Sequence, residues 1–169
     1  MASLFKEYLF TKSSFSAIIL YITLFFFALP LFSEERKHGG KAIEVKVQAG
    51  TSDGQLIFTP NEFTFERGKY YKLVISNPSP VSHYFSSDAF ATHIFTRKVE
   101  VASSNGKTLA EIHGAIHDLE LSPNTTVEWF FYPMTKGKNL KLYCHKEDHE
   151  EMGMVGTINI VGSLSFGKK

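Results

Sequence analysis

The chain contains one cysteine, and it lies in a segment crowded with other side chains that can bind a metal. In YCHKEDHEEMGMVG, residues 143–156, Cys144, His149 and Met154 follow one another with four residues between each pair. One thiolate, two imidazoles and a distant thioether are the donors of a blue-copper site, with two histidines and a cysteine in a plane and a weak axial methionine. The spacing therefore predicts a copper site that needs a second histidine from elsewhere in the chain.

The second imidazole has six candidates: His38, His83, His93, His113, His117 and His145. His145 follows Cys144 directly, and neighbouring side chains at the end of a strand point to opposite sides. His83 fits best, because it follows a predicted strand and the turn NPSP, so it can lie at the same end of the fold as Cys144. His93 and His117 stay open as alternatives, and the residue pattern predicts partial burial of His117 near the site.

Alternating apolar and polar residues begin after Gly39 and Gly40 and predict strands that are buried on one face. Eight segments show this pattern: residues 42–49, 62–66, 70–76, 96–102, 117–121, 125–132, 139–144 and 156–162. Eight short strands separated by turn residues predict an all-β fold, a Greek-key β-sandwich. A short helical turn is expected near residues 86–95. We expect one domain at 42–162, after a linker at 34–41 and before a tail at 163–169.

The alternation in residues 139–144 also predicts where the thiol lies. Leu140, Leu142 and Cys144 share one face, while Lys141 and Tyr143 share the other. The thiol is therefore expected to point inward at the end of a strand, shielded from solvent but close to the edge of the fold.

Residues 1–33 have the order of an export signal. Lys6 and Lys12 precede an apolar run at 16–32, and a polar segment follows. As a helix the run would span roughly 25 Å, near the lower limit for crossing a bilayer. A cleaved signal peptide, a retained membrane anchor that contacts the membrane, and a buried core helix all stay open, and Leu31 and Ser33 make a poor cleavage pattern. Either export interpretation places residues 34–169 outside the cytoplasm, in a periplasm or an equivalent lumen.

Composition excludes several classes of partner and site. The formal net charge is +1 and the charges are mixed along the chain, so no basic stripe for nucleic acid is present. A lone cysteine cannot form an intrachain disulfide, and it excludes zinc sites built from several thiolates. A cysteine-nucleophile enzyme would need an oxyanion site and an orienting Asn or Asp, neither of which is marked in the sequence. We expect no catalysis by this chain alone.

Two rival metal assignments are disfavoured by spacing. Met152 could replace Met154 as the axial donor, but it lies two residues nearer to the cysteine and is expected to pack or to face solvent. His113 and His117 on one strand would be roughly 13 Å apart, too far to share an ion. They are interpreted as ordinary strand histidines.

The segments VISNPSPVSH and YCHKEDHEEMGMVGTINI resemble those of the cupredoxins, the plastocyanin and azurin group, and the resemblance covers about residues 42–161. It implies copper ligands at His83, Cys144, His149 and Met154 and one type 1 copper per chain. It also implies one-electron transfer between redox proteins outside the cytoplasm. In this family the second histidine usually presents an edge to solvent as the exit for the electron, a role that falls to His149, with Tyr143 as a possible second exit.

Two departures from the family pattern stand out. Glu147 and Asp148 lie where many relatives have Pro-Gly, and the long separation of His83 from Cys144 implies an inserted segment at residues 84–118. Two other functions stay open: a copper carrier or delivery protein for an oxidase, and a metal-free cupredoxin-fold interaction module.

Overall fold

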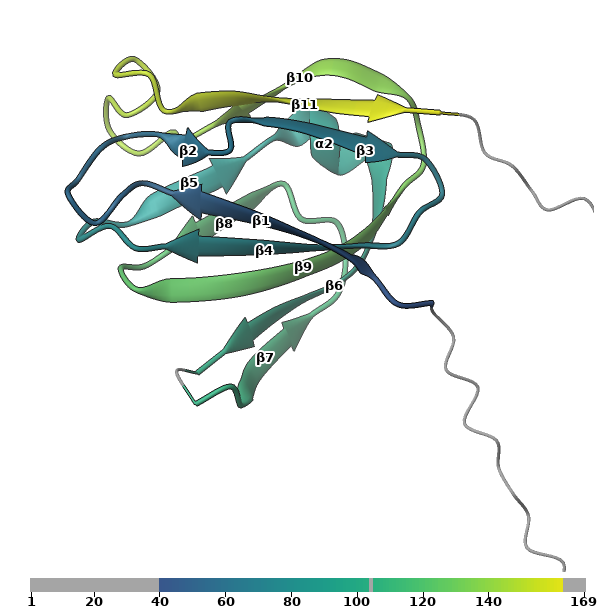
Figure 1. Ribbon diagram of the computed structural model, residues 1–169, viewed down its shortest axis with the longest axis horizontal. Helices are drawn as coiled ribbons and strands as arrows, with labels where there is room; N and C mark the ends of the chain where they lie inside the picture. The colour runs from purple at the N-terminus through teal and green to yellow at the C-terminus, as the bar shows by residue number, and fades with distance from the viewer. Residues whose placement is uncertain (1–39, 104, 163–169) are drawn as a thin grey trace, which may run out of the picture. The chain divides into compact units, whose positions relative to one another are not determined.

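The computed structural model describes residues 40–103 and 105–162, and these form a sandwich of two β-sheets (Figure 1). The predicted signal or anchor at residues 1–33 and the predicted tail at 163–169 lie outside the described residues. Within the described ranges, no helix is both long enough and apolar enough to cross a membrane. The two-sheet β-sandwich expected from the strand pattern is confirmed.

The first sheet has six strands in the order β2-β1-β4-β9-β6-β7. Its members are β1 (Ile43–Ala49), β2 (Phe58–Thr59), β4 (Tyr71–Asn77), β6 (Ile94–Ala102), β7 (Thr108–Ile112) and β9 (Thr125–Pro133). β1 runs parallel to β4, and the other neighbours are antiparallel.

The second sheet has five strands in the order β3-β11-β10-β5-β8. Its members are β3 (Glu62–Glu66), β5 (His83–Ser86), β8 (Asp118–Leu121), β10 (Gly137–Tyr143) and β11 (Val155–Val161). β3 is parallel to β11, and the other pairs are antiparallel. All eight predicted strands are present in the two sheets, with ends within two residues of the prediction.

The segment at residues 84–118 forms most of β5, then α2 (Asp88–His93), β6 and β7. α2 begins after Ser87, whose hydroxyl oxygen accepts a hydrogen bond from the Phe90 N–H over 3.3 Å. Serine is a favoured residue at this position because its side chain satisfies a free N–H of the first turn. The helical turn expected near residues 86–95 is confirmed.

Large aromatic side chains fill the space between the sheets. Trp129 and Phe131 of β9 are buried on alternate positions, as expected for a strand with one face in the core. The ring centroid of Phe85 lies 6.3 Å from that of Trp129, and the centroid of Phe65 lies 5.2 Å from that of Phe131. These contacts join the two sheets, and each fully buried side chain of this size contributes roughly 1.5–3 kcal/mol. The sandwich is therefore a rigid base for the loops at its ends.

Four residues mark one end of the sandwich, the site end. Gly50 directly follows β1, Asn77 ends β4, His83 begins β5 and Cys144 directly follows β10. The loops of the site end gather at the left of Figure 1. The fold thus brings residues that are far apart in the chain to one place.

Candidate metal centre

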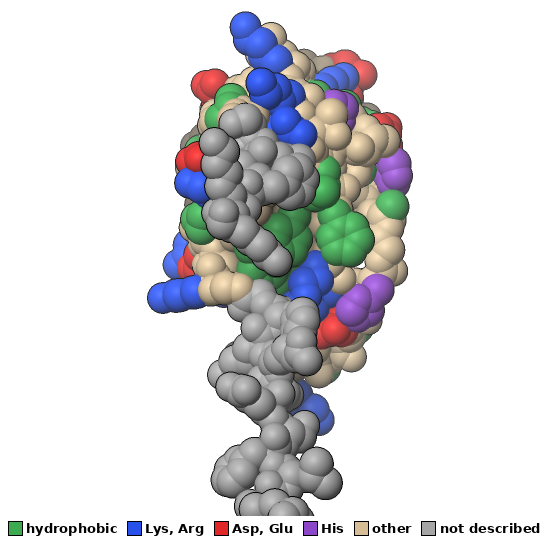
Figure 2. Space-filling model, turned by 90° about the vertical axis from the view of Figure 1, so that its right-hand side faces the viewer, with side chains coloured by type: hydrophobic (Ala, Val, Ile, Leu, Met, Phe, Trp, Pro, Cys, Tyr) green, Lys and Arg blue, Asp and Glu red, His purple; other side chains and the backbone are tan. Residues whose placement is uncertain are grey.

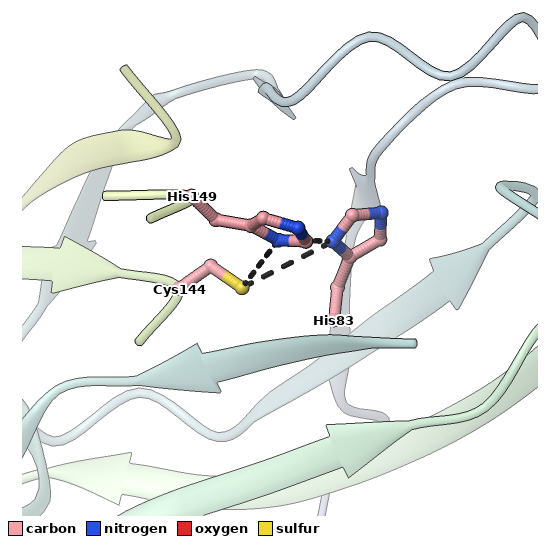
Figure 3. A group of neighbouring side chains, drawn as sticks. All are labelled: His83, Cys144 and His149. Carbon is pink, nitrogen blue, oxygen red and sulfur yellow. Dashed lines mark hydrogen bonds between the residues drawn. The ribbon is translucent and has the colours of Figure 1, made fainter. Parts of the chain in front are cut away.

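Three of the four predicted ligands converge at the site end (Figure 3). The Nδ1 atoms of His83 and His149 are 3.3 Å apart, and the Cys144 sulfur lies 3.4 Å from His149 Nδ1 and 4.0 Å from His83 Nδ1. All three side chains are buried. The structure therefore brings together two imidazoles and one sulfur that are separated by up to 66 residues of chain.

His83 is held by a tight backbone approach. It is the first residue of β5 and pairs with Leu121 of β8, and its side chain is completely buried. Gly50 lies against the ring: a Cβ at that position would be 2.4 Å from His83 Nε2. Gly50 also has a φ of 75°, in the left-handed region that favours glycine. Only glycine combines this backbone conformation with room for the imidazole.

Asn77 fixes the loop between β4 and His83. Its side-chain amide donates to the Val81 and Leu121 carbonyl oxygens, both over 2.8 Å, and its side-chain oxygen accepts from the Ser79 N–H over 2.9 Å. Asn77 is buried, so these partners replace the water that its polar atoms would otherwise bind. The loop that leads into His83 is therefore tied to β8.

The loop after Cys144 closes on itself through its backbone. The Met154 N–H donates to the His149 carbonyl oxygen over 2.9 Å, and the Cys144 N–H donates to the Met154 carbonyl oxygen over 3.1 Å. The Cys144 sulfur accepts a further hydrogen bond from the Tyr84 N–H over 3.3 Å. These bonds place the cysteine, the histidine and the methionine of the loop beside one another.

The two methionines of this loop differ sharply in exposure. Met154 is completely buried, whereas Met152 is 62% exposed. A weak axial thioether must lie inside the site. Burial therefore favours Met154 over Met152 as the sulfur that completes the donor set.

The site suits a cation. His83 Nδ1 and His149 Nδ1 face each other and the sulfur, and each neutral imidazole has one nitrogen with a free lone pair. For a first-row ion in a trigonal plane, metal–nitrogen bonds of about 2.0 Å and metal–sulfur bonds of about 2.3 Å place the donors roughly 3.5–3.8 Å apart. The observed separations of 3.3, 3.4 and 4.0 Å lie close to this range. The donor set is that of one type 1 copper site.

Burial keeps His83 in the form that can bind a metal. It lowers the pKa of His83 to about 4, with further lowering by the nearby His149 and Lys146. The imidazole is therefore neutral at neutral pH, and a metal does not compete with a proton for it. His83 Nε2 is buried and has no hydrogen-bond partner among the described residues.

The other histidines lie outside this group. His145 is exposed, and its Nε2 lies 2.9 Å from an Asp118 carboxylate oxygen, while its ring stacks on Tyr84 with a centroid distance of 4.0 Å. The predicted partial burial of His117 near the site is wrong: it is exposed, and its Nδ1 lies 3.1 Å from Asp88 Oδ1. His117 precedes β8, so the strand alternation that predicted its burial does not extend to it.

His93 and His113 also have other partners. His93 ends α2, and its Nδ1 lies 2.5 Å from the Ala89 carbonyl oxygen. His113 follows β7 and lies within hydrogen-bond distance of Arg97 O and Glu111 Oε1. Among the described residues, His83, Cys144 and His149 are the one group of three or more His, Cys, Asp or Glu side chains close enough to hold an ion.

Three residues that support the site were not identified from the sequence as supporting residues. Gly50 and Tyr84 carry no local signal, because their roles depend on contacts with distant strands. Asn77 stands in a turn segment, and its two bonds to carbonyl oxygens become visible only in the folded chain. The one available signal in the sequence is an asparagine directly after the predicted strand at 70–76.

No family model matches this chain, and no curated protein matches it at a significant level. Solved structures do. A multicopper oxidase from Campylobacter jejuni, described as a metallo-oxidase, superposes with a TM-score of 0.54 and 18% identity over 73% of this chain and 31% of that chain. A Cu-containing nitrite reductase from Thermus scotoductus superposes with a TM-score of 0.51 and 13% identity over 72% of this chain and 31% of that chain.

Auracyanin A, a "blue" copper protein from Chloroflexus aurantiacus, superposes with a TM-score of 0.45 and 15% identity over 72% of this chain and 100% of that chain. The chain spans about a third of the length of the oxidase and of the reductase. The similarity to those two proteins shows the fold. The chain has the cupredoxin fold that its sequence resembles.

Proposed function

We propose that this chain is a one-copper protein that carries single electrons, and that His83, Cys144, His149 and Met154 would hold the copper. The observation that supports this most is the buried triangle of two imidazole nitrogens and one sulfur on a cupredoxin fold. Copper, when bound, supplies a couple between two oxidation states that differ by one electron. The two sheets hold the ligands in place, so little rearrangement accompanies the change of charge.

Residues around the sulfur tune the site. The Tyr84 N–H points at the Cys144 sulfur and stabilises negative charge on it. Met154, which is completely buried, and the aromatic core keep water away from the Cys144 sulfur. Both features influence the reduction potential, since hydrogen bonds to the sulfur and an apolar environment are the usual means of tuning it.

Burial favours electron transfer over delivery of the ion. Copper hand-over requires the ligands to open to a partner, but His83, Cys144 and Met154 are completely buried and their loops are closed by backbone hydrogen bonds. An electron can leave without that opening. His149 retains 6% exposure and we assign the exit to it, with half-buried Tyr143 as a second candidate.

We propose an electron carrier and not a multicopper enzyme for two reasons. The oxidase and the reductase that share the fold are each about three times longer than the matched part. Among the described residues one candidate metal group is found, and oxygen reduction by a multicopper enzyme needs a further copper cluster. We infer a carrier that works with redox proteins outside the cytoplasm, after export through its N-terminal segment.

Titration of the purified protein with Cu(II) tests the proposal. One equivalent should bind and produce the intense visible absorption of a copper–thiolate bond, with a reversible one-electron potential. Replacing the sulfur in Cys144→Ser should abolish this absorption, while His113→Ala, at an exposed histidine outside the group, should leave it unchanged.

Three results would contradict the proposal. An absorption that survives in Cys144→Ser would show that the ligand assignment is wrong. Tight Cu(I) binding with rapid transfer to an acceptor and no visible band would support copper delivery, and failure to bind either ion would leave an interaction module.

A further inference from the structure

The end of the sandwich away from the metal site has a distinctive surface, called the opposite end below. It comprises Arg67, Phe95, Arg97, Tyr132, Met134 and Lys136. Phe95 is 59% exposed and Met134 is 44% exposed. Figure 2 views this end and shows hydrophobic side chains beside Lys and Arg side chains.

Strand pairing, ring stacking and hydrogen bonds connect five of these residues, all except Lys136. Phe95 pairs with Tyr132 across β6 and β9, and the Tyr132 ring stacks on Tyr70 with a centroid distance of 4.6 Å. The Tyr70 hydroxyl accepts a hydrogen bond from Arg97 over 3.1 Å. Arg67 donates through Nε to the Met134 carbonyl oxygen over 2.9 Å, which joins the β3–β4 loop to the end of β9. Aromatic, thioether and guanidinium groups are therefore presented side by side.

The two ends differ in charge. At the site end the loop after Cys144 carries one lysine and four acids: Lys146, Glu147, Asp148, Glu150 and Glu151. The opposite end carries Arg67, Arg97 and exposed Lys136, and its Glu66 is paired with Lys69. A negatively charged surface is therefore attracted to the opposite end and repelled by the site end.

The described chain enters the domain at the opposite end. β1 begins at Ile43, which pairs with Tyr71 and donates its N–H to the Tyr70 carbonyl oxygen over 2.8 Å. β1 then runs about 20 Å to Gly50 beside His83. The ten residues 33–42, which separate the apolar run from Ile43, can reach at most about 36 Å. If the apolar run at 16–32 stays in a bilayer, the chain leaves that bilayer within this distance of the opposite end.

We propose that the opposite end contacts a bilayer surface that contains anionic phospholipids. Aromatic side chains such as Phe95 and Tyr132 favour the interface between the acyl chains and the headgroups, and Arg67, Arg97 and Lys136 attract phosphate groups there. This contact places His83 and His149 on the far side of the sandwich from the lipid. The metal site therefore stays free for redox partners while the protein lies on the membrane.

Two exposed methionines at opposite ends provide an internal comparison for a test. The full chain is reconstituted in lipid nanodiscs of phosphatidylcholine alone or with phosphatidylglycerol. Each sample receives a brief hydroxyl-radical pulse, and the oxidation of Met134 and Met152 is measured by mass spectrometry. Phosphatidylglycerol should slow the oxidation of Met134 several-fold and leave Met152, which is 62% exposed at the site end, unchanged.

Charge variants test the cause of the protection. The triple variant Arg67→Gln/Arg97→Gln/Lys136→Gln should lose the protection of Met134 by phosphatidylglycerol. The matched control Lys146→Gln, at the site end, should retain it. Raising the salt concentration should weaken the protection in the unaltered chain, because mobile ions screen the attraction.

Three outcomes would overturn the proposal. Equal protection of Met134 and Met152 would show that no particular end faces the lipid. Equal protection of Met134 in the two lipid compositions would show that anionic headgroups are not recognised. Oxidation of Met134 at the same rate in nanodiscs and in detergent would show that the surface does not contact lipid.

Discussion

The His83 imidazole depends on a glycine as much as on its metal-binding partners. Gly50→Ala would place a methyl group 2.4 Å from Nε2 and 2.8 Å from Cδ2 of the ring, in a backbone conformation that already disfavours a side chain. We expect a loss of about 1–3 kcal/mol in the free energy of unfolding, because the ring must move or the backbone must shift. Urea unfolding and the copper absorption spectrum would measure the two effects.

Gly54→Ala is the matched control for this substitution. Gly54 has a similar φ of 86°, but a Cβ there meets nothing within 4 Å. It should share the conformational cost and leave the copper spectrum unchanged. If both variants had the same spectrum and stability, crowding of the His83 ring would not be the reason for glycine at position 50.

Burial of His83 makes the copper-free protein sensitive to acid. The pKa of His83 is about 4 in the folded chain and 6.5 in a solvated reference. Between these values the unfolded chain binds a proton that the folded chain does not, so the free energy of unfolding falls as the pH drops from 6.5 to 4. The full effect is about 3 kcal/mol.

Urea unfolding of the copper-free protein at several pH values checks this dependence. His83→Gln removes the titrating group and should show a shallower loss of stability between pH 6.5 and 4 than the unaltered chain. Identical pH dependence in the two proteins would mean that His83 is not the buried titrating group.

At the scale of elements, the loop between β4 and β5 positions the first histidine through Asn77. Asn77→Ala leaves the carbonyl oxygens of Val81 and Leu121 and the N–H of Ser79 without their partner. We expect a loss of roughly 2–3 kcal/mol in the free energy of unfolding, together with weaker copper binding. Chemical unfolding and copper titration measure these changes.

Asn105→Ala is the comparison, since Asn105 also bonds within a turn but is exposed. It should change stability by less than about 1 kcal/mol and leave copper binding intact. A loss at position 77 no larger than that at position 105 would contradict the positioning role of Asn77.

Strands buried on one face could be predicted from the sequence, and the others could not. β9 alternates Val127, Trp129 and Phe131 with more exposed residues, and this pattern is visible without coordinates. β7 is exposed at every position, and β5 buries three of its four residues, so neither alternates. Both depend on pairing with distant strands, which no local pattern encodes.

The ligands of the site could be predicted from the sequence, but the residues that support them could not. Cys144, His149 and Met154 lie in one loop, so their proximity could be predicted from their spacing in the sequence, and backbone hydrogen bonds within the loop hold them together. The choice of His83 rested on its position after a strand and on family resemblance, and the structure places it beside the other two. Gly50 could not be found, because its role is a contact across the end of the sandwich.

At the scale of the whole molecule, the two ends of the sandwich differ in the side chains that they present. The acidic loop after Cys144 lies at the metal site, while the opposite end carries exposed aromatic, thioether and cationic side chains and the start of β1. The core of Trp129 and its aromatic neighbours joins these ends. The proposed carrier would therefore meet its redox partners at the site end.

Anomalous X-ray diffraction at the copper edge, from crystals of the copper-loaded protein, tests the central claim most directly. We predict one strong peak per chain, enclosed by His83 Nδ1, Cys144 Sγ and His149 Nδ1 at bonding distance, with the Met154 sulfur as the axial neighbour. A peak bound elsewhere on the chain, or no peak from protein that contains stoichiometric copper, would contradict the account.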